Sequence, residues 1–342
     1  MSLKITITDI ANQLNTTPAT VSRALNNHPS ISEKRKKAIQ EAAAKLNYKR
    51  NKIASSLRSG QTGLIGVIIP SAEINFFGSV VHGIESIANE NGYNILMYQS
   101  KESKEHEAKG IETFLSARVD GILVSIAKGT TEYSHFVSAK ASKIPIVFFD
   151  RTNFDLDIHS VVIDDYKGAF IATTHLIEQG YKRVAHISGP QHLKIFKDRL
   201  TGYKDALDAS GIKSEPDLIY HGDVSLDAGR KGIKHFLGIS NPADALFAVE
   251  DFTALGAIKE LKERGINIPI DFGVVGFANE AFGEHITPTL STIDQQTVQM
   301  GKESFRLLLQ MINAGKTQAS VQKIVLEPIP IFRESSSRKS LK

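Results

Sequence analysis

The 342-residue sequence contains no cysteine, and no part of it approaches the ~20 apolar residues of a membrane-spanning helix. The absence of cysteine excludes disulfides, thiolate chemistry and cysteine-ligated zinc, and it suits a reducing compartment. The N-terminal stretch MSLKITITDIANQL has no apolar run of signal-peptide length. We therefore expect a cytoplasmic protein, associated with the nucleoid if it binds DNA.

The signatures of common enzyme classes are also missing. No G-x-x-x-x-G-K, G-x-G-x-x-G or G-x-S-x-G motif is present to carry phosphate, dinucleotide or acyl chemistry. The eleven histidines are scattered, and His82, His159, His186 and His285 show no i, i+4 pairing for a metal. We expect a protein that is not an enzyme and that requires no metal or other cofactor.

Positive charge is concentrated at the N-terminus. The first sixty residues carry eleven Lys or Arg and three Asp or Glu, whereas the remaining 282 residues carry 30 and 34. The net charge of +4 therefore conceals a basic head and an acidic body. This distribution is typical of a nucleic-acid-binding protein.

The head has the pattern of a helix-turn-helix followed by a third helix. Thr6 and Asp9 match a capping box in front of a helix over about residues 7–13. Thr17 is a good N-cap and Pro18 suits the first helical position, so a second helix is predicted after a tight turn. A third helix is predicted from Ser32 and Glu33, and the expected three-helix core includes Val21, Leu25, Ile39, Ala42 and Leu46.

The second helix is the expected recognition helix, because its N-terminal residues point into the major groove in this geometry. Pro18, Ala19 and Arg23 are predicted to reach base edges, with Arg23 donating two hydrogen bonds to guanine. Predicted phosphate contacts are Thr17, Thr20, Ser22 and Asn26. The alternative is an ordinary solvated helix with Arg23 as a surface charge, but the basic head and both helix caps favour DNA binding.

A short segment of small residues, Ala54 to Leu57, follows the head. A lone Leu57 between Lys52 and Arg58 is a poor choice for a free surface. Minor-groove binders insert such side chains between base steps and kink the duplex. From the spacing alone, a minor-groove wedge and an ordinary interdomain linker remain equally good interpretations.

From Gly63 onward, apolar runs typical of strands alternate with helix-length stretches. One set is LIGVIIP, YNILMYQ, DGILVSI and IPIVFFD, and a second is SVVIDD, RVAHISGP, DLIYHG, ALFAVED and FGVVGFAN. Short runs rich in Val and Ile, separated by helices, predict parallel sheets covered by helices on both faces. The expected fold is an all-α head and an α/β body of two doubly wound subdomains, with a ligand cleft between them.

Residues near the predicted strand ends are the candidates for ligand binding in this cleft. They are Asn75, Phe76, Phe77, Ser125, Asp150, Arg199, Glu250 and Asn279. An acid, an arginine and amides beside aromatic rings suit a polyhydroxylated ligand, because each buried hydroxyl needs a partner. Each also has a structural alternative: Asp150 and Asp251 as helix caps, Phe76 and Phe77 as core, or Arg199 in an ion pair.

The runs ITDIANQLNTTPATVSRALN, SISEKRKKAI, LNYKRNKIASSLRSG and LIGVIIP resemble the LacI/GalR family of bacterial transcription repressors, and the similarity extends to about Phe332. The resemblance implies a homodimer on a near-palindromic operator, with Leu57 of paired hinge helices inserted into the minor groove. It adds Thr8, Tyr48 and Ala54 to the expected DNA contacts. It also implies a periplasmic-binding-protein-like body in which Arg199, in an Arg-x-x-Gly pattern, reaches the effector.

By the same resemblance, residues 1–50 form the DNA-binding domain, 51–61 the hinge, 62–334 the effector-binding body and 335–342 a flexible tail. The first subdomain is expected to comprise 62–161 and 292–322, and the second 162–291 and 323–334. No heptad of leucines follows, so a dimer is expected rather than a tetramer.

Several positions depart from the family pattern. The usual Gly-Val-Ser turn reads Asn15-Thr16-Thr17, the threonine expected after SEK is Arg35, and the proline before the hinge asparagine is Arg50. In the body, Ala278 replaces a carboxylate, Val224 replaces a stacking aromatic and Glu250 replaces an asparagine. These changes leave the operator sequence and the identity of the effector open.

The sequence as a whole therefore predicts a DNA-binding transcription regulator, a repressor controlled by a small carbohydrate or carbohydrate derivative. The alternatives are a cytosolic ligand-binding protein of transport-protein type and a sugar-modifying enzyme. A transport protein would share the body but would not need the basic head.

Overall fold

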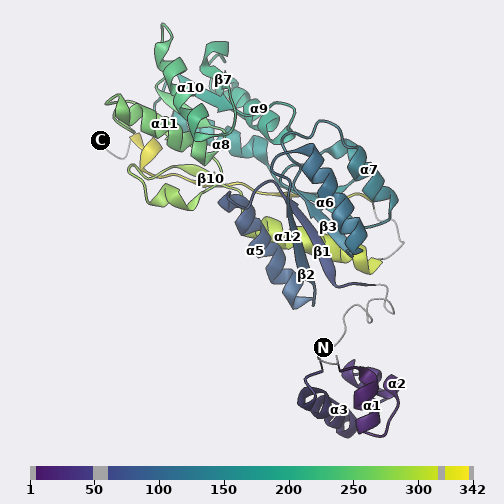
Figure 1. Ribbon diagram of the computed structural model, residues 1–342. Coiled ribbons are helices and arrows are strands. Elements are labelled where there is room, and N and C mark those ends of the chain that lie inside the picture. Colours follow the sequence, from purple (N-terminus) through teal and green to yellow (C-terminus); the bar gives the residue numbers. More distant parts are fainter. Residues whose placement is uncertain (1–4, 49–60, 315–319, 339–342) are drawn as a thin grey trace. The chain divides into compact units, whose positions relative to one another are not determined.

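The computed structural model describes residues 5–48, 61–314 and 320–338, in two compact units, Met1–Thr62 and Gly63–Lys342. The first unit contains α1 (Ile7–Gln13), α2 (Pro18–Leu25) and α3 (Glu33–Lys45) (Figure 1). The predicted starts of α1 and α2 are confirmed: Asp9 accepts a hydrogen bond from the Thr6 backbone N at 2.7 Å, and the Thr17 hydroxyl accepts one from the Thr20 backbone N at 3.2 Å.

The three helices of the head share one small core, as predicted. Ile10, Val21 and Ile39 are almost completely buried where the apolar faces of the helices meet. Partly buried side chains pack around them, namely Ile7, Leu14, Leu25, Ile31, Leu46 and Tyr48. Apolar residues at helical spacing therefore determine the packing of the head and leave most of its charged residues exposed.

The body contains two parallel sheets. The first has the order β11-β5-β4-β3-β1-β2. Its strands are β1 (Leu64–Ile69), β2 (Asn94–Gln99), β3 (Gly121–Val124), β4 (Ile146–Phe149), β5 (His159–Ile163) and β11 (Lys323–Leu326). The second sheet has the order β7-β6-β8-β9. Its strands are β6 (Val184–Ser188), β7 (Ile219–His221), β8 (Ala245–Ala248) and β9 (Gly273–Val275).

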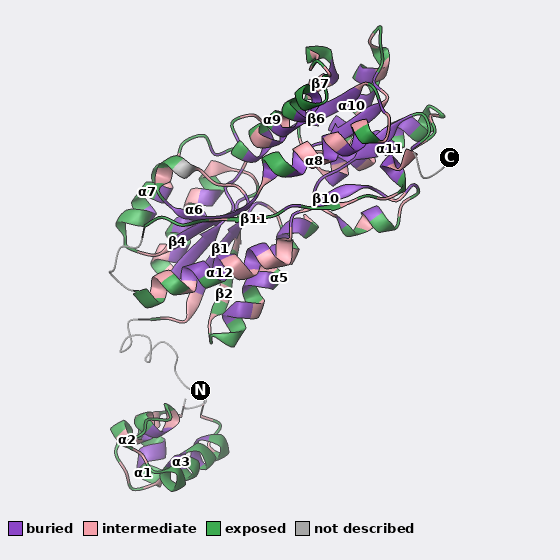
Figure 2. Cartoon of the chain, turned by 180° about the vertical axis from the view of Figure 1, so that it is seen from behind, coloured by how far each residue is buried: buried purple, intermediate pink, exposed green. Residues whose placement is uncertain are grey.

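Helices cover both faces of each sheet. The first sheet is flanked by α5 (Asn75–Glu90), α6 (Lys104–Ala117), α7 (Ser134–Ala141) and α12 (Thr297–Ala314), and the second by α8 (Asp165–Glu178), α9 (Lys194–Ala209), α10 (Leu226–Gly238) and α11 (Asp251–Glu263). Most strand residues are buried on both faces (Figure 2). Val67 packs towards α5 and α12, and its neighbour Ile68 packs towards α6, as the alternation of side chains along a strand requires. The predicted architecture of the body is confirmed.

Three details of the predicted organisation are corrected. The SVVIDD run was assigned to the second set of strands, but it forms β5, which pairs with β4 in the first sheet. Residues 323–326 were assigned to the second subdomain, but they form β11 beside β5. Residues 292–294 were assigned to the first subdomain, but they form β10 (Thr292–Asp294), which pairs with β12 (Ile329–Ile331) and bridges to residues at the end of β9. Strand pairing joins distant segments, so local sequence cannot locate these crossings.

The expected flexible tail is ordered where the structure describes it. Ser335 and Ser336 are buried in the short helix η4 (Glu334–Ser336). The Ser335 hydroxyl donates to the carbonyl of Val274 at 2.7 Å, and Ser336 lies 2.8 Å from His175 Nε2. These contacts fasten the C-terminal segment to the second subdomain. Within residues 5–48, 61–314 and 320–338, no helix is long and apolar enough to cross a membrane.

Candidate functional site

The predicted recognition residues are displayed on the surface of the head. Thr8, Thr17, Pro18, Ala19, Arg23 and Asn26 are exposed, and Thr20 and Ser22 are half-buried. Tyr48 differs, because its ring packs half-buried against the head core. Ala54 and Leu57 lie outside the described residues.

Two departures from the family pattern contact each other. The turn between α1 and α2 contains Asn15 with φ 47°, a left-handed conformation that asparagine tolerates better than most residues. Next to it, Arg35 of α3 donates a hydrogen bond through Nη2 to the Thr16 hydroxyl at 3.1 Å. The hydrogen bond between Arg35 and Thr16 therefore connects the Asn-Thr-Thr turn to α3, and the two departures from the family pattern support each other.

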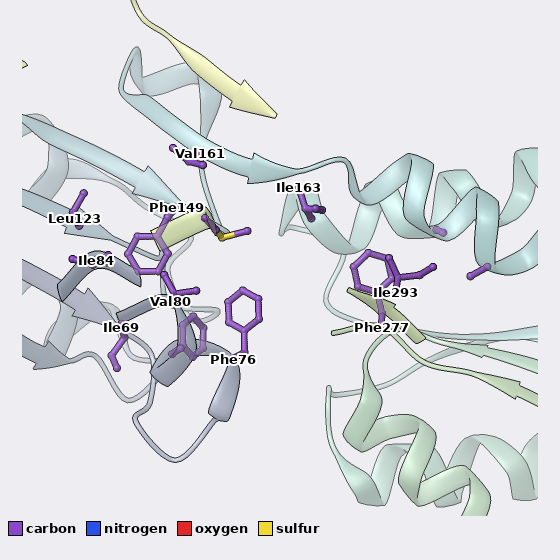
Figure 3. Packing of buried hydrophobic residues seen from close by; sticks show 14 of the residues in the cluster. Ile69, Phe76, Val80, Ile84, Leu123, Phe149, Val161, Ile163, Phe277 and Ile293 are labelled. Atoms are coloured by element: carbon purple, nitrogen blue, oxygen red, sulfur yellow. The ribbon is translucent and has the colours of Figure 1, made fainter. Parts of the chain in front are cut away.

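A cavity of about 330 Å³ lies between the two subdomains of the body. The first subdomain contributes Glu73, Ile74, Phe76, Phe77 and Asp150. The second contributes Ile195, Phe196, Arg199, Val224, Ser225, Leu226, Glu250, Phe252, Ala278 and Glu280. Gln295, which directly follows β10 in the segment that connects the two subdomains, completes the lining. Figure 3 shows Phe76 among the buried side chains of the first subdomain, with Phe277 and Ile293 across from it on the second. The cavity is therefore lined from both sides.

Arg199 is anchored from several directions and is 2% exposed. Its Nε donates to Asp165 at 2.8 Å, its Nη1 donates to the carbonyl of Val249 at 2.7 Å, and its Nη2 donates to Gln295 at 3.3 Å. The guanidinium also lies 3.7 Å from the centre of the Phe277 ring. Burial raises the pKa of Asp165 and the adjacent Arg199 opposes this shift. The ion-pair alternative for Arg199 is thus correct, and the same side chain lines the cavity.

The glycine of the Arg-x-x-Gly pattern has a packing role. Gly202 lies one helical turn beyond Arg199, where α9 crosses α8. A Cβ atom at this position would come within 2.2 Å of the carbonyl oxygen of Tyr166. Gly202 therefore lets α9 approach α8 closely enough for Arg199 to reach Asp165.

Asp150 reaches the cavity from a strained turn at the end of β4. Its φ of 59° lies in the left-handed region, which costs energy for a residue other than glycine. The Ser125 hydroxyl donates to its carboxylate at 3.3 Å. Burial raises the pKa of Asp150, and the charges of Arg151 and Arg199 oppose that shift. Ser125 thus supports Asp150 from behind and is not among the lining residues.

Three further carboxyls gather where α11 begins. Glu250 caps the helix by accepting from the Thr253 backbone N at 3.2 Å, and burial raises its pKa to about 7. Asp251 accepts from the Glu280 backbone N and from the Thr292 hydroxyl, both at 2.7 Å, and burial raises its pKa to about 6. The Glu280 carboxylate accepts from the Phe76 backbone N at 3.3 Å, across the cavity, and burial raises its pKa.

The structure brings Phe76, Phe77, Asp150, Arg199 and Glu250 together as predicted. Two other candidates lie beside the cavity rather than in its lining. Asn75 is exposed, and its side chain hydrogen-bonds Glu280. Asn279 was expected to bind the effector, but its side-chain amide donates to Asp294 at 3.1 Å and accepts from Arg333 at 3.2 Å. The backbone of Asn279 has a φ of 58°, and in this conformation its side chain lies beside Asp294 and Arg333.

Several lining residues were not predicted. Ile195 and Phe196 lie four and three residues before Arg199, so helical spacing could have placed them on the same face. Phe252 follows the candidate Glu250 by two residues, whereas Gln295 carried no comparable signal, because it reaches the cavity only through the folding of distant segments. Glu280 lies two residues after Ala278, which replaces a carboxylate of the family pattern. Among the described residues, no group of three or more histidine or acidic side chains is arranged to hold a metal ion.

The comparisons with known proteins agree with both units. Residues 62–334 match the family described as periplasmic binding proteins and sugar binding domain of LacI family, and residues 6–51 match the bacterial regulatory proteins of the lacI family. The chain belongs to the LacI family of transcription regulators. It is 31% identical to the HTH-type transcriptional regulator RegA of Clostridium saccharobutylicum over 331 residues, which cover 96% of this chain and 98% of RegA.

Two solved LacI-family structures have the same fold over nearly the full chain. A complex of the transcriptional regulator CelR with cellobiose is 26% identical, with a TM-score of 0.72 over 97% of this chain and 99% of CelR. The lac repressor dimer bound to operator and the anti-inducer ONPF is 24% identical, with a TM-score of 0.86 over 97% of this chain and 99% of that one. This LacI-family protein is therefore a DNA-binding transcription regulator with a helix-turn-helix head and a ligand-binding body.

Proposed function

We propose that this protein is a repressor that binds a near-palindromic operator as a homodimer and responds to a small carbohydrate or carbohydrate derivative. The observation that carries the proposal is one cavity lined by both subdomains, with Phe76 and Asp150 on one side and Arg199 and Glu250 on the other. A ligand that contacts both sides favours one degree of closure over another. Such a difference in affinity between two states is what shifts their populations and couples the cavity to DNA binding.

The lining supports a carbohydrate-sized ligand. Carboxylates, a guanidinium, an amide and the Ser225 hydroxyl supply hydrogen-bonding groups, and aromatic rings supply apolar faces. The similar regulator CelR was solved with cellobiose. We also propose that the protein has no catalytic activity and acts in the cytoplasm at the nucleoid. The basic head displays an exposed recognition helix, which a transport protein or a sugar-modifying enzyme would not need.

Fluorescence anisotropy with the full chain tests this function. A labelled DNA duplex from the regulated promoter is titrated with and without a panel of sugars. We expect tight binding to one near-palindromic sequence, and at least one panel member should change that affinity. Equal affinity for operator and random DNA would exclude the repressor function, and sugar binding without any change in DNA affinity would exclude the coupling.

The hinge is tested separately, because Leu57 and Ala54 lie outside the described residues. If Leu57 is a minor-groove wedge, Leu57→Ala should reduce DNA bending and operator affinity together while effector binding is unchanged. Bending is measured by gel mobility on permuted sites. An unchanged bend would assign Leu57 to the linker instead.

A further inference from the structure

The lining of the cavity has a surplus of acidic residues. Four of its lining residues are acidic, Glu73, Asp150, Glu250 and Glu280, and one, Arg199, is basic. That arginine already has an anionic partner, because its Nη2 lies 2.7 Å from Asp165. The charge of Arg199 is therefore largely balanced before any ligand enters.

The cation nearest to Asp150 is balanced as well. Arg151 Nε lies 3.8 Å from the Asp150 carboxylate, whereas its Nη1 is 2.8 Å from Glu102. Arg151 therefore pairs mainly with Glu102 rather than with Asp150. Neither described arginine near the cavity has a full charge to spare for the lining carboxyls.

The donors that hold these carboxyls are neutral. Asp150 receives a bond from the Ser125 hydroxyl, Glu280 from the Phe76 backbone and the Asn75 side chain, and Glu250 from the Thr253 backbone. Neutral donors fix the orientation of a carboxylate without cancelling its charge. Asp150 and Glu280 are only 5% and 4% exposed, so water compensates little of the cost of ionising them.

We propose that the effector carries a protonated amino group, which these carboxyls bind, and that acidic or phosphorylated ligands of the same size are rejected. The inference rests on the proposed function, in which this cavity is the effector site. An ammonium group supplies both the positive charge and the N–H donors that the lining lacks, whereas an anion would meet like charge in a poorly solvated space. The Phe76, Phe196 and Phe252 rings in the same lining suit a cation and the apolar face of a sugar ring. An amino sugar has this chemistry.

Charge-matched sugars test the inference by calorimetry on the full chain. The probes are the 2-amino, 2-acetamido, parent and uronic acid forms of glucose, galactose and mannose, so that charge changes on a constant ring. On at least one ring, the amino form should bind about tenfold or more tightly than both neutral forms. The uronic acid should show no binding. The inference is overturned if a neutral or acidic form binds as well as its amino form, or if no amino form binds at millimolar concentration.

Variants locate the preference. Glu250→Gln keeps the helix cap, because a glutamine oxygen also accepts from Thr253, and Glu280→Gln keeps an acceptor for Phe76. The double variant should lose most of the preference for the amino sugar and bind the neutral form at least as well. Glu85→Gln, an exposed change on α5, is the matched control and should leave the preference intact. An unchanged preference in the double variant would overturn the assignment, and thermal melting confirms that each variant is folded.

Operator anisotropy separates this inference from the proposed function. If the amino sugar binds and the operator affinity does not change, the charge preference stands and the regulatory coupling fails. If a neutral sugar alone changes the operator affinity, the regulatory function stands and the charge preference fails.

Discussion

Most charged side chains of the head are exposed, whereas the body also buries several of its charged side chains. Arg23 and most lysines of α3 face solvent, whereas Asp150, Asp165, Arg199 and Glu280 are at most 5% exposed. Exposed charges act on a partner across water, over about 8 Å at physiological ionic strength, and salt screens them. Buried charged groups interact with directly contacting partners, and burial shifts their pKa values. The comparison indicates that DNA binding by the head responds to salt, whereas the body responds to pH and to the charge of its ligand.

The largest expected effect is in the body. Arg199→Ala leaves Asp165 buried without its cation, and we expect a loss of about 3 to 5 kcal/mol in the free energy of unfolding. Arg306→Ala is the matched control, because Arg306 is exposed and pairs with Glu303 on the surface of α12. That pair should contribute about 0 to 1 kcal/mol.

Urea unfolding measures both arginine variants. Adding Asp165→Asn to Arg199→Ala should restore part of the lost stability, since it removes the stranded charge. Similar losses of stability in Arg199→Ala and Arg306→Ala would show that the burial of Arg199 does not increase its contribution to stability. Effector binding by a folded Arg199→Ala protein then reports the direct contribution of the guanidinium to the ligand.

A steric change at the same site is expected to rank next. Gly202→Ala places a methyl group 2.2 Å from the Tyr166 carbonyl oxygen, so α8 and α9 must move apart at a cost of about 1 to 3 kcal/mol. Gly78→Ala is the control, because no heavy atom lies within 4 Å of its added Cβ. Gly78 lies in α5, where replacing glycine by alanine should raise the free energy of unfolding by up to about 1 kcal/mol. Opposite shifts in melting temperature are expected, and shifts of the same sign would contradict the packing role of Gly202.

In the head, Arg23→Ala should weaken operator binding by about 1 to 3 kcal/mol and relax one symmetric position in each half-site. Affinity for random DNA should change less, because a base contact is lost and most phosphate contacts remain. Anisotropy titrations at several salt concentrations make the measurement. Equal losses on operator and random DNA would identify Arg23 as a phosphate contact, and the exposed Arg306→Ala change in the body provides the control.

The smallest expected effect is the pH dependence of Glu250. Its pKa is raised by burial from 4.5 to about 7, so the folded protein binds a proton that the unfolded chain releases. The contribution of this group to stability is complete below about pH 4.5 and is lost as the pH rises to about 7. Glu250→Gln removes this loss, so the variant should be more stable than the parent at pH 8 and equal to it at pH 4.

Thermal melting across this pH range measures the difference. The neighbouring groups that face Glu250 are Asp251, Glu280, Asp150 and Arg199, and all are present in both proteins, so their titration largely cancels. A constant difference between the proteins at all pH values would show that Glu250 does not titrate in this range. Added salt should change it little, in contrast to the DNA affinity of the head.

The sequence by itself determined the features that depend on neighbouring residues. Thr17 and Pro18 begin α2 because a cap and its helix lie within one turn of chain, and strand-like runs formed strands because their side chains suit a doubly covered sheet. The candidates Asp150 and Glu250 could be named because each ends a predicted strand. The recognition helix of the head was accessible to sequence reasoning for the same reason.

Tertiary structure alone decided which distant residues meet. Arg199 pairs with Asp165 only because Gly202 allows α9 to approach α8, and Glu280 faces Phe76 across 204 positions of sequence. The crossings defeated prediction because β11 and β10 choose partners by sheet pairing, which no local pattern encodes. The charge balance of the cavity is likewise a property of the assembled lining, since the cost of each buried carboxyl depends on cations that the chain brings near from elsewhere.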